Sequence, residues 1–290
     1  MQHNEYINTA LIDADYVLWI ACNPNKVMNE HGVPQRIDNK YVYTPKTLEE
    51  AVATCDAYLE DILNLTHADS HVICLTTGVT FRFKMDNSYK ANRIGMEKPL
   101  WFHEVKAHLV KDWGAIEVDG LEADDIVCII KNNLENSFII AADKDILDCI
   151  PGKHFDARKG KVSFIETTKE EAALNFAKSL LTGDSVDGVP NLIKGMGPKT
   201  AETELLKRME FNNTLISAQQ IFIYHLGEYE GIKRFARQYQ LLKIIDSLEQ
   251  LPKDITFVMP VPLCYNCVET LMSEDVKQNL GWDYSQLDAP

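Results

Sequence analysis

Long apolar runs and secretion features are both missing from this 290-residue chain. A membrane-spanning helix needs roughly 18 to 20 consecutive apolar residues, and the first residues, Met-Gln-His-Asn-Glu, do not resemble a signal peptide. The seven cysteines are an odd number and lie mostly in apolar stretches, which is typical of buried thiols in a reducing compartment. We therefore expect a cytoplasmic protein without a disulfide framework.

Basic residues are also scarce. Lysine and arginine number 29 against 43 acidic residues, so the formal net charge is −14. This balance argues against a protein that coats nucleic acid non-specifically, because such proteins normally show a basic surface. It does not exclude an enzyme acting on nucleic acid, since bound cations reverse the local field around clustered acids.

Acidic residues are abundant, and several of them are concentrated in three short clusters. The clusters lie at residues 122–125, 143–145 and 184–187, and Asp13 stands alone after an apolar run. Two carboxylates about 5 Å apart repel by about 3 kcal/mol at an effective dielectric constant near 20, and burial adds a further cost. Mg²⁺ or Mn²⁺ relieves this repulsion, since both cations favour oxygen ligands. A helix cap or a solvated helix end is the alternative for any single cluster.

The order of apolar segments predicts an α/β fold with a mostly parallel sheet flanked by helices. We expect strands at 9–12, 71–76, 115–118 and 137–142, an edge strand at 162–165, and helices at 47–65 and 122–134. Residues 23–45 contain three prolines and predict an excursion or hairpin. The pattern is helical from about 169 to 248, so we predict an α/β metal-binding core over 1–168 and a mainly helical region with a C-terminal tail over 169–290.

This arrangement allows the separated acids to meet. Asp13 and Asp143 follow predicted strands, and ligands bind outside the carboxyl ends of strands in such sheets. Glu122 and Asp125 are three residues apart on a predicted helix and therefore share a face. Residues 184 and 187 repeat that spacing.

A glycine-containing segment over residues 194–201 is a candidate phosphate site. Glycines ahead of a helix leave backbone N–H groups free, Pro198 suits the first helical position, and Lys199 adds positive charge. The spacing is not that of a P-loop. An ordinary glycine turn between two helices is the alternative.

A second candidate is the basic and aromatic stretch from Phe81 to Arg93. Cations mixed with aromatic rings can neutralise phosphates and stack on bases. The alternative is a solvated basic loop.

Taken in order, several motifs resemble the 5′-nuclease superfamily, which comprises flap endonucleases, the 5′-nuclease domains of bacterial DNA polymerase I and bacteriophage 5′–3′ exonucleases. The matching motifs are Asp13, residues 121–125, 143–145, 183–190 and 195–201, so the resemblance spans roughly residues 9–205. Residues 13–15 (Asp-Ala-Asp) and 89–93 (Tyr-Lys-Ala-Asn-Arg) look most like the phage enzymes. The resemblance implies a PIN-like core and a role in DNA replication, and a phage origin would place the protein in the host cytoplasm.

The family also implies roles for individual residues. Two or more Mg²⁺ ions, with Mn²⁺ as a substitute, would be held by Asp13, Glu122, Asp124, Asp125, Asp143, Asp145, Asp184 and Asp187. Lys90 and Arg93 would act with Asp13 near the scissile phosphate, under an arch or gateway near 80–101. A helix–two-turn–helix near 190–208, often with a K⁺ ion in the family, would grip the duplex. DNA contacts are expected from Arg82, Lys84, Tyr89, Lys194, Gly195, Gly197, Lys199 and Thr200. One departure is Thr77, which stands where relatives commonly carry an acid.

We therefore expect a monomeric, Mg²⁺-dependent 5′–3′ exonuclease or structure-specific flap endonuclease. It would hydrolyse phosphodiester bonds at DNA 5′ ends, nicks or flaps by two-metal catalysis, and cleavage of RNA–DNA hybrids stays open. The first alternative is a haloacid-dehalogenase-like phosphatase with Asp13 as nucleophile and Asp15 as its acid–base partner. That alternative leaves the glycine segment and the pair at 184 and 187 without a role. A non-catalytic DNA-binding protein is the second alternative.

Overall fold

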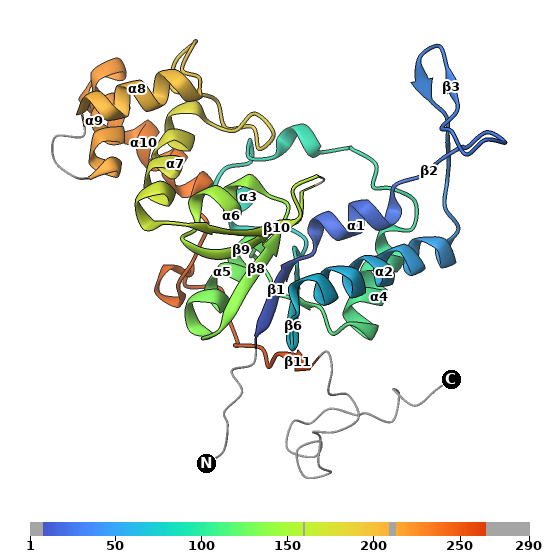
Figure 1. Cartoon of the computed structure of the whole chain (residues 1–290). Helices are drawn as coiled ribbons and strands as arrows, with labels where there is room; N and C mark the ends of the chain where they lie inside the picture. Colours follow the sequence, from blue (N-terminus) through green and yellow to red (C-terminus); the bar gives the residue numbers. More distant parts are fainter. Residues whose placement is uncertain (1–7, 159, 209–212, 265–290) are drawn as a thin grey trace, which may run out of the picture.

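A seven-stranded, mostly parallel sheet forms the centre of the protein (Figure 1). The computed structural model describes residues 8–158, 160–208 and 213–264. The strand order is β10-β9-β8-β1-β6-β11, and β7 shares the free edge of β6 with β11. The strands are β1 (Thr9–Asp13), β6 (Ser70–Leu75), β7 (Ile116–Glu117), β8 (Ser137–Ala141), β9 (Gly152–Asp156), β10 (Ser163–Thr167) and β11 (Leu263–Cys264). Only β10 and β11 pair antiparallel with their neighbours in this sheet.

The three central strands are buried on both faces, and this explains their continuous apolar sequence. Leu11, Val72 and Ile139 face one side, while Ile12, Ile73 and Ile140 face the other. Helices α1 (Asp15–Cys22), α2 (Leu48–Thr66) and α4 (Phe102–Asp112) cover the second side, and α5 (Ala123–Asn133) covers the first. Helix α6 (Lys144–Cys149) follows β8 and packs with α5. Such a two-faced sheet is typical of α/β proteins.

Four helices follow the sheet and enclose a separate apolar cluster (Figure 1). They are α7 (Lys169–Thr182), α8 (Pro198–Arg208), α9 (Thr214–Leu226) and α10 (Glu228–Leu242). A capping box between Thr168 and Glu171 begins α7. Gly231 allows α9 and α10 to approach closely, because a Cβ there would lie 2.6 Å from the Cα atom of Ile223.

Short elements complete the fold. The proline-containing excursion forms two nested antiparallel pairs that project away from the sheet (Figure 1). The outer pair is β2 (Asn25–Lys26) with β5 (Tyr43–Thr44), and the inner pair is β3 (Arg36–Ile37) with β4 (Lys40–Tyr41). The segment between β6 and α4 carries α3 (Phe81–Met85) and the short helix η1 (Ala91–Arg93), and η3 (Leu248–Gln250) follows α10.

The predicted fold class, a mostly parallel sheet flanked by helices, is confirmed. The functional division at residue 168 stays a prediction, and the end of the predicted tail, residues 265–290, lies outside the described part of the chain. None of the described helices has the length and apolarity that a membrane span requires.

Candidate metal centre

The fold brings most of the predicted acids to one cavity of about 270 Å³. Asp13 ends β1, and Asp143 caps α6 directly after the neighbouring parallel strand β8. Glu122 caps α5, whose first turn contains Asp124. The cavity is lined by seven carboxylates together with Lys90 and Arg93; the acids are Asp13, Asp15, Glu122, Asp124, Asp143, Asp145 and Asp187.

Three of these carboxylates lie in surroundings that disfavour their negative charge. Burial, followed by repulsion from Asp15 and Asp143, raises the pKa of Asp13 well above its usual value. Burial raises the pKa of Asp124 strongly as well, with Asp125 and Glu122 adding to the effect. The pKa of Asp145 rises to about 7, mainly through burial. These groups therefore lack sufficient compensating positive charge.

Other acids at the centre already have cationic partners. Lys90 Nζ lies 2.8 Å from Glu122 Oε1, and Arg93 Nη2 lies 2.6 Å from Asp187 Oδ1. The Tyr89 hydroxyl lies 3.1 Å from Glu122 Oε2 and 3.2 Å from Asp187 Oδ2, so it bridges two of the predicted clusters. Although burial opposes ionisation of Glu122, the positive charges of Lys90 and Arg82 hold its pKa below the usual value.

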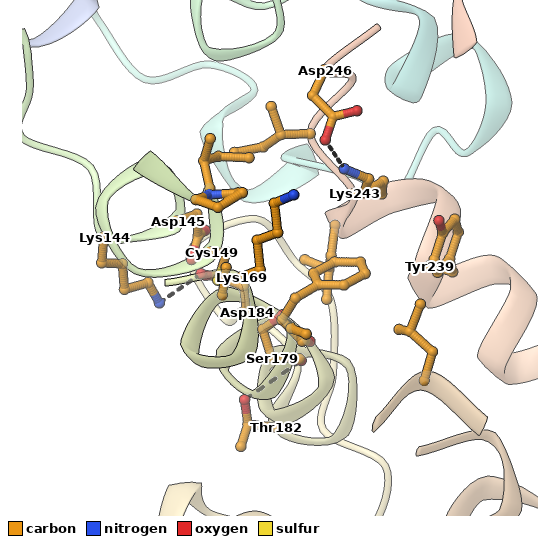
Figure 2. Close-up of a pocket in the computed structure, with 18 of the residues that line it drawn as sticks. Lys144, Asp145, Cys149, Lys169, Ser179, Thr182, Asp184, Tyr239, Lys243 and Asp246 are labelled. Carbon is orange, nitrogen blue, oxygen red and sulfur yellow. Dashed lines mark hydrogen bonds and ion pairs between the residues drawn. The ribbon is translucent and has the colours of Figure 1, made fainter. Parts of the chain in front are cut away.

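Asp184 lies beside this cavity rather than in its wall. It lines an adjoining cavity of about 240 Å³ that shares Asp145 with the first. Figure 2 shows its carboxylate paired with Lys144, whose Nζ is 3.0 Å from Asp184 Oδ2. The N–H of Val186 also donates to Asp184 at 2.7 Å. Asp184 and Asp187 thus occupy one turn but face different surroundings.

The donor set fits a hard divalent cation, although its ligands are not assembled into a finished site. Among the described residues, no three acid, histidine or cysteine side chains stand in metal-binding geometry. Asp13 accepts a 3.3 Å hydrogen bond from the N–H of Asp15, and no basic side chain in the described ranges forms an ion pair with it. Buried, uncompensated carboxylate oxygens are the ligands that Mg²⁺ and Mn²⁺ prefer.

Two predicted DNA contacts are corrected by the structure, and a predicted metal ligand lies outside the lining of the cavity. Arg82 and Tyr89 were expected to contact DNA, but they are only 1% and 3% exposed, respectively. Asp125 was expected to bind metal, but its side chain is fully buried and paired with Arg82. Helix α3 turns Arg82 into the core, where a paired guanidinium avoids the cost of an isolated buried charge.

The end of β6 contributes to the cavity through residues that the sequence prediction did not assign to the metal set. Thr76, rather than Thr77, lines the cavity, and its hydroxyl accepts from the N–H of Ala123 at 2.9 Å. The N–H of Thr76 donates to Asp15 Oδ1 at 3.0 Å. Asp15 is therefore a further carboxylate of the centre, and its position two residues after Asp13 was the available signal.

The predicted DNA-contacting residues of the glycine segment lie outside the acid cavity. Lys194, Lys199 and Thr200 are exposed around the start of α8, and Gly195 has a φ of +88°. Met196 between the glycines is buried and anchors the turn to the helical cluster. Lys84 is exposed on α3. Their contact with DNA stays a prediction.

Residues 39–177 match the family model described as the 5′–3′ exonuclease N-terminal, resolvase-like domain. No curated protein matches the chain. Among solved structures, the chain is similar to a bacteriophage T5 flap endonuclease solved with DNA and metal ions, with a TM-score of 0.57 and 12% identity over 82% of this chain and 89% of that one. A mutant of the T5 5′-exonuclease gives a TM-score of 0.51 and 13% identity over 82% and 87% of the two chains. The catalytic core of Rad2 with a DNA substrate gives 0.50 and 14% identity over 97% and 90%.

These structural likenesses establish a shared fold, and the family model covers the strands and helices that carry Glu122, Asp124, Asp143 and Asp145. The chain is thus similar to the 5′–3′ exonuclease family in sequence over residues 39–177, and it shares the fold of the T5 and Rad2 nucleases.

Proposed function

We propose that this protein is a divalent-metal-dependent 5′–3′ exonuclease or flap endonuclease that hydrolyses phosphodiester bonds of DNA. The observation that carries the proposal is the cavity in which seven carboxylates meet two basic side chains, within a 5′-nuclease fold. The solved T5 flap endonuclease contains DNA and metal ions, and the Rad2 core contains a DNA substrate. Both comparisons support the same class of substrate for this chain.

The side chains of the cavity fall into two functional groups. Asp13, Asp124, Asp143 and Asp145 would hold Mg²⁺, with Glu122 and Asp187 at the boundary between the acids and the basic side chains. When bound, a pair of such ions lowers the pKa of a water molecule and stabilises the attacking and leaving oxygens of an in-line displacement. Asp13 and Glu122 are already buried, so their carboxylates would lose little hydration when a substrate closes the site.

Lys90 and Arg93 are suited to stabilise the charge that develops on the phosphate. Both line the cavity, and both hold their cationic ends against carboxylates at its wall. A donor fixed before the reaction stabilises developing charge without further reorganisation. These two residues would therefore orient the scissile phosphate toward the acids.

The grip on the duplex is assigned to the turn before α8. Free N–H groups at a helix start, together with Lys194 and Lys199, favour a phosphate rather than a base edge. The family resemblance supports K⁺ at this turn. Such contacts predict recognition of DNA ends or junctions instead of a fixed sequence.

The decisive experiment is cleavage of 5′-labelled blunt, nicked and flapped duplexes with Mg²⁺, with the products resolved by length. Mononucleotides indicate exonuclease action, and an intact released flap indicates endonuclease action. Asp143→Asn should abolish cleavage, while Lys90→Ala should slow it by about 10²-fold or more with a modest loss of DNA binding. Asp61→Asn and Lys161→Ala alter exposed residues away from the cavity and serve as matched controls. Full activity of Asp143→Asn, or no cleavage by the wild type on any of these substrates, would contradict the proposal.

A further inference from the structure

Arg82 is the largest of the fully buried side chains in the described core, at 1% exposure. Arginine is almost never fully buried unless it is paired. Its guanidinium donates to both oxygens of Asp125, at 2.6 and 2.7 Å, and to the backbone oxygen of Lys243 at 2.7 Å. Nη1 also lies 3.3 Å from Glu122 Oε2. Through these hydrogen bonds the guanidinium links Glu122, which lines the acid cavity, and Asp125 to the segment after α10.

Asp125 has no acceptor site left for a metal. An ionised carboxylate offers about four acceptor sites. Arg82 donates to each oxygen, the N–H of Ile245 donates to Oδ1 at 2.7 Å, and the N–H of Glu122 donates to Oδ2 at 3.3 Å. Asp125 is also absent from the lining of the cavity, although its neighbour Asp124 is present.

Glu122, in contrast, faces the cavity, and its position depends on this pair. Its backbone N–H is held by Asp125, and its Oε2 is approached by Arg82 and by the Tyr89 hydroxyl. Its second oxygen, Oε1, faces Lys90. Because Oε2 and the backbone N–H of Glu122 are both held, the direction in which Oε1 points is also fixed.

We propose that Arg82 is a positioning residue of the metal centre, which fixes Glu122 through a buried brace with Asp125, and that Asp125 is the counter-charge of this brace rather than a metal ligand. This inference rests on the proposed function of the site. The brace requires arginine because its planar fork reaches both oxygens of Asp125, Glu122 and a backbone carbonyl at once, whereas lysine presents a single ammonium group.

The test is a double-mutant cycle of Arg82→Gln and Asp125→Asn, with Arg82→Lys as the charge-retaining variant. Each neutralising single variant leaves one buried charge unpaired and can lose stability for that reason alone. The double variant leaves neither charge unpaired and keeps two side chains that can hydrogen-bond, so it separates folding from positioning. Thermal unfolding identifies which variants are folded. Mn²⁺ binding by calorimetry, together with kcat and KM on a labelled duplex, then reports the state of the site.

The folded double variant and Arg82→Lys should bind Mn²⁺ about tenfold more weakly and lower kcat by about 10²-fold, with an unchanged KM because Arg82 does not face DNA. The double variant should be no worse than the more damaged single variant, because the two residues act as one unit. The pair of Arg237→Gln and Asp86→Asn is a matched control, because Arg237 likewise ties the segment before η1 to α10 but contacts no acid of the cavity. That control should leave Mn²⁺ binding unchanged.

Three results would overturn the inference. If Arg82→Lys and the double variant kept the Mn²⁺ affinity and kcat of the wild type, the pair of Arg82 and Asp125 would only stabilise the fold and would not position Glu122. Loss of a bound Mn²⁺ ion in Asp125→Asn but not in Arg82→Gln would make Asp125 a ligand. A raised KM with unchanged kcat would make Arg82 a DNA contact. Should the wild type fail to cleave DNA, the proposed function fails, but the Mn²⁺ measurements still decide the role of the brace.

Discussion

At the scale of single residues, the acids of the centre divide by whether a cation already balances them. Glu122 and Asp187 contact Lys90 and Arg93, whereas Asp13 has no basic side chain at ion-pair distance among the described residues. At the end of β1, the desolvation of Asp13 is therefore not offset by an ion pair. A bound divalent cation would supply the compensating positive charge, so we propose that Asp13 contributes to metal affinity.

A histidine outside the centre sets a testable pH dependence of stability. Burial lowers the pKa of His71 on β6 to about 4, although a hydrogen bond with the backbone of Trp113 opposes the shift. Between this value and the unfolded value of about 6.5, the unfolded chain binds a proton that the folded chain does not. The free energy of unfolding therefore decreases as the pH falls through this window, by up to about 3 kcal/mol from this group.

Urea unfolding at pH 7.5 and pH 5 measures this contribution. His71→Gln should lose less stability on acidification than the wild type, because it has no imidazole to protonate. His31→Gln is the control, since His31 has a 77% exposed side chain. Equal losses in the wild type and His71→Gln would show that the neutral imidazole is not linked to folding.

The sequence predicted the position of a residue well where that residue follows a clear apolar strand, and poorly where it lies on a short helix. Asp13 and Asp143 were placed at one edge because each follows a clear apolar strand, and the neighbouring parallel strands β1 and β8 carry them there. Arg82 and Tyr89 were misplaced because α3 has only five residues, too few for a hydrophobic period to show which side is buried. Their burial depends on Asp125 and Asp187, which lie about 40 and 100 residues away in sequence.

At the scale of elements, the turn over residues 184–189 and the segment over 86–93 form one unit. The turn is closed by reciprocal hydrogen bonds of 2.8 Å between Asp184 and Val189. The backbone oxygen of Asp187 accepts from the N–H of Lys90 at 2.8 Å, and Arg93 binds the Asp187 side chain. The acid turn thus holds both candidate catalytic cations.

Gly188 is the position at which this contact can be tested. Its φ is +73°, and an added Cβ would lie 2.9 Å from the backbone oxygen of Ser88. Gly188→Ala should therefore lower the free energy of unfolding by about 1 to 3 kcal/mol, through left-handed strain and displacement of the facing backbone. Because Lys90 moves with that backbone, we also expect a reduced kcat.

Gly227→Ala separates the effect of backbone strain on stability from the effect of a displaced Lys90 on kcat. Its φ is +79°, but no atom lies within 4 Å of the Cβ position. Its ψ of 166° places it in a backbone region that only glycine adopts readily, so Gly227→Ala should lose stability through backbone strain but keep a normal kcat in a cleavage assay. A normal kcat in folded Gly188→Ala would show that the turn does not position Lys90.

Elements with strong periodicity were predictable, and those held by pairing alone were not. The central strands and α2, α5 and α7 follow from apolar patterns and caps. Strand β9 begins at a glycine and alternates little, and it exists because β8 and β10 pair with its two edges. The two-residue β11 pairs with β6 from about 190 residues away, which no local pattern indicates.

At the scale of the whole molecule, an overall excess of negative charge is combined with a local cluster of acids at one cavity. The formal charge of −14 and the seven acids of the cavity together make the native state favour cations. General screening by salt and specific binding of a divalent ion would both stabilise such a protein. Only specific binding depends on individual carboxylates, so the two contributions can be separated.

Mg²⁺ should raise the melting temperature of the wild type by about 5 °C at a concentration near 100 times its Kd, since this corresponds to about 2.7 kcal/mol of linkage. NaCl at matched ionic strength should give a smaller shift, and EDTA should reverse the effect of Mg²⁺. Asp13→Asn should abolish the Mg²⁺ shift because it removes a carboxylate that no basic side chain pairs with in the described structure, while Asp61→Asn should retain it. Differential scanning calorimetry of the three proteins makes the comparison. Equal shifts with Mg²⁺ and NaCl would mean that the acids are screened rather than ligated, and the metal centre would then lose its physical basis.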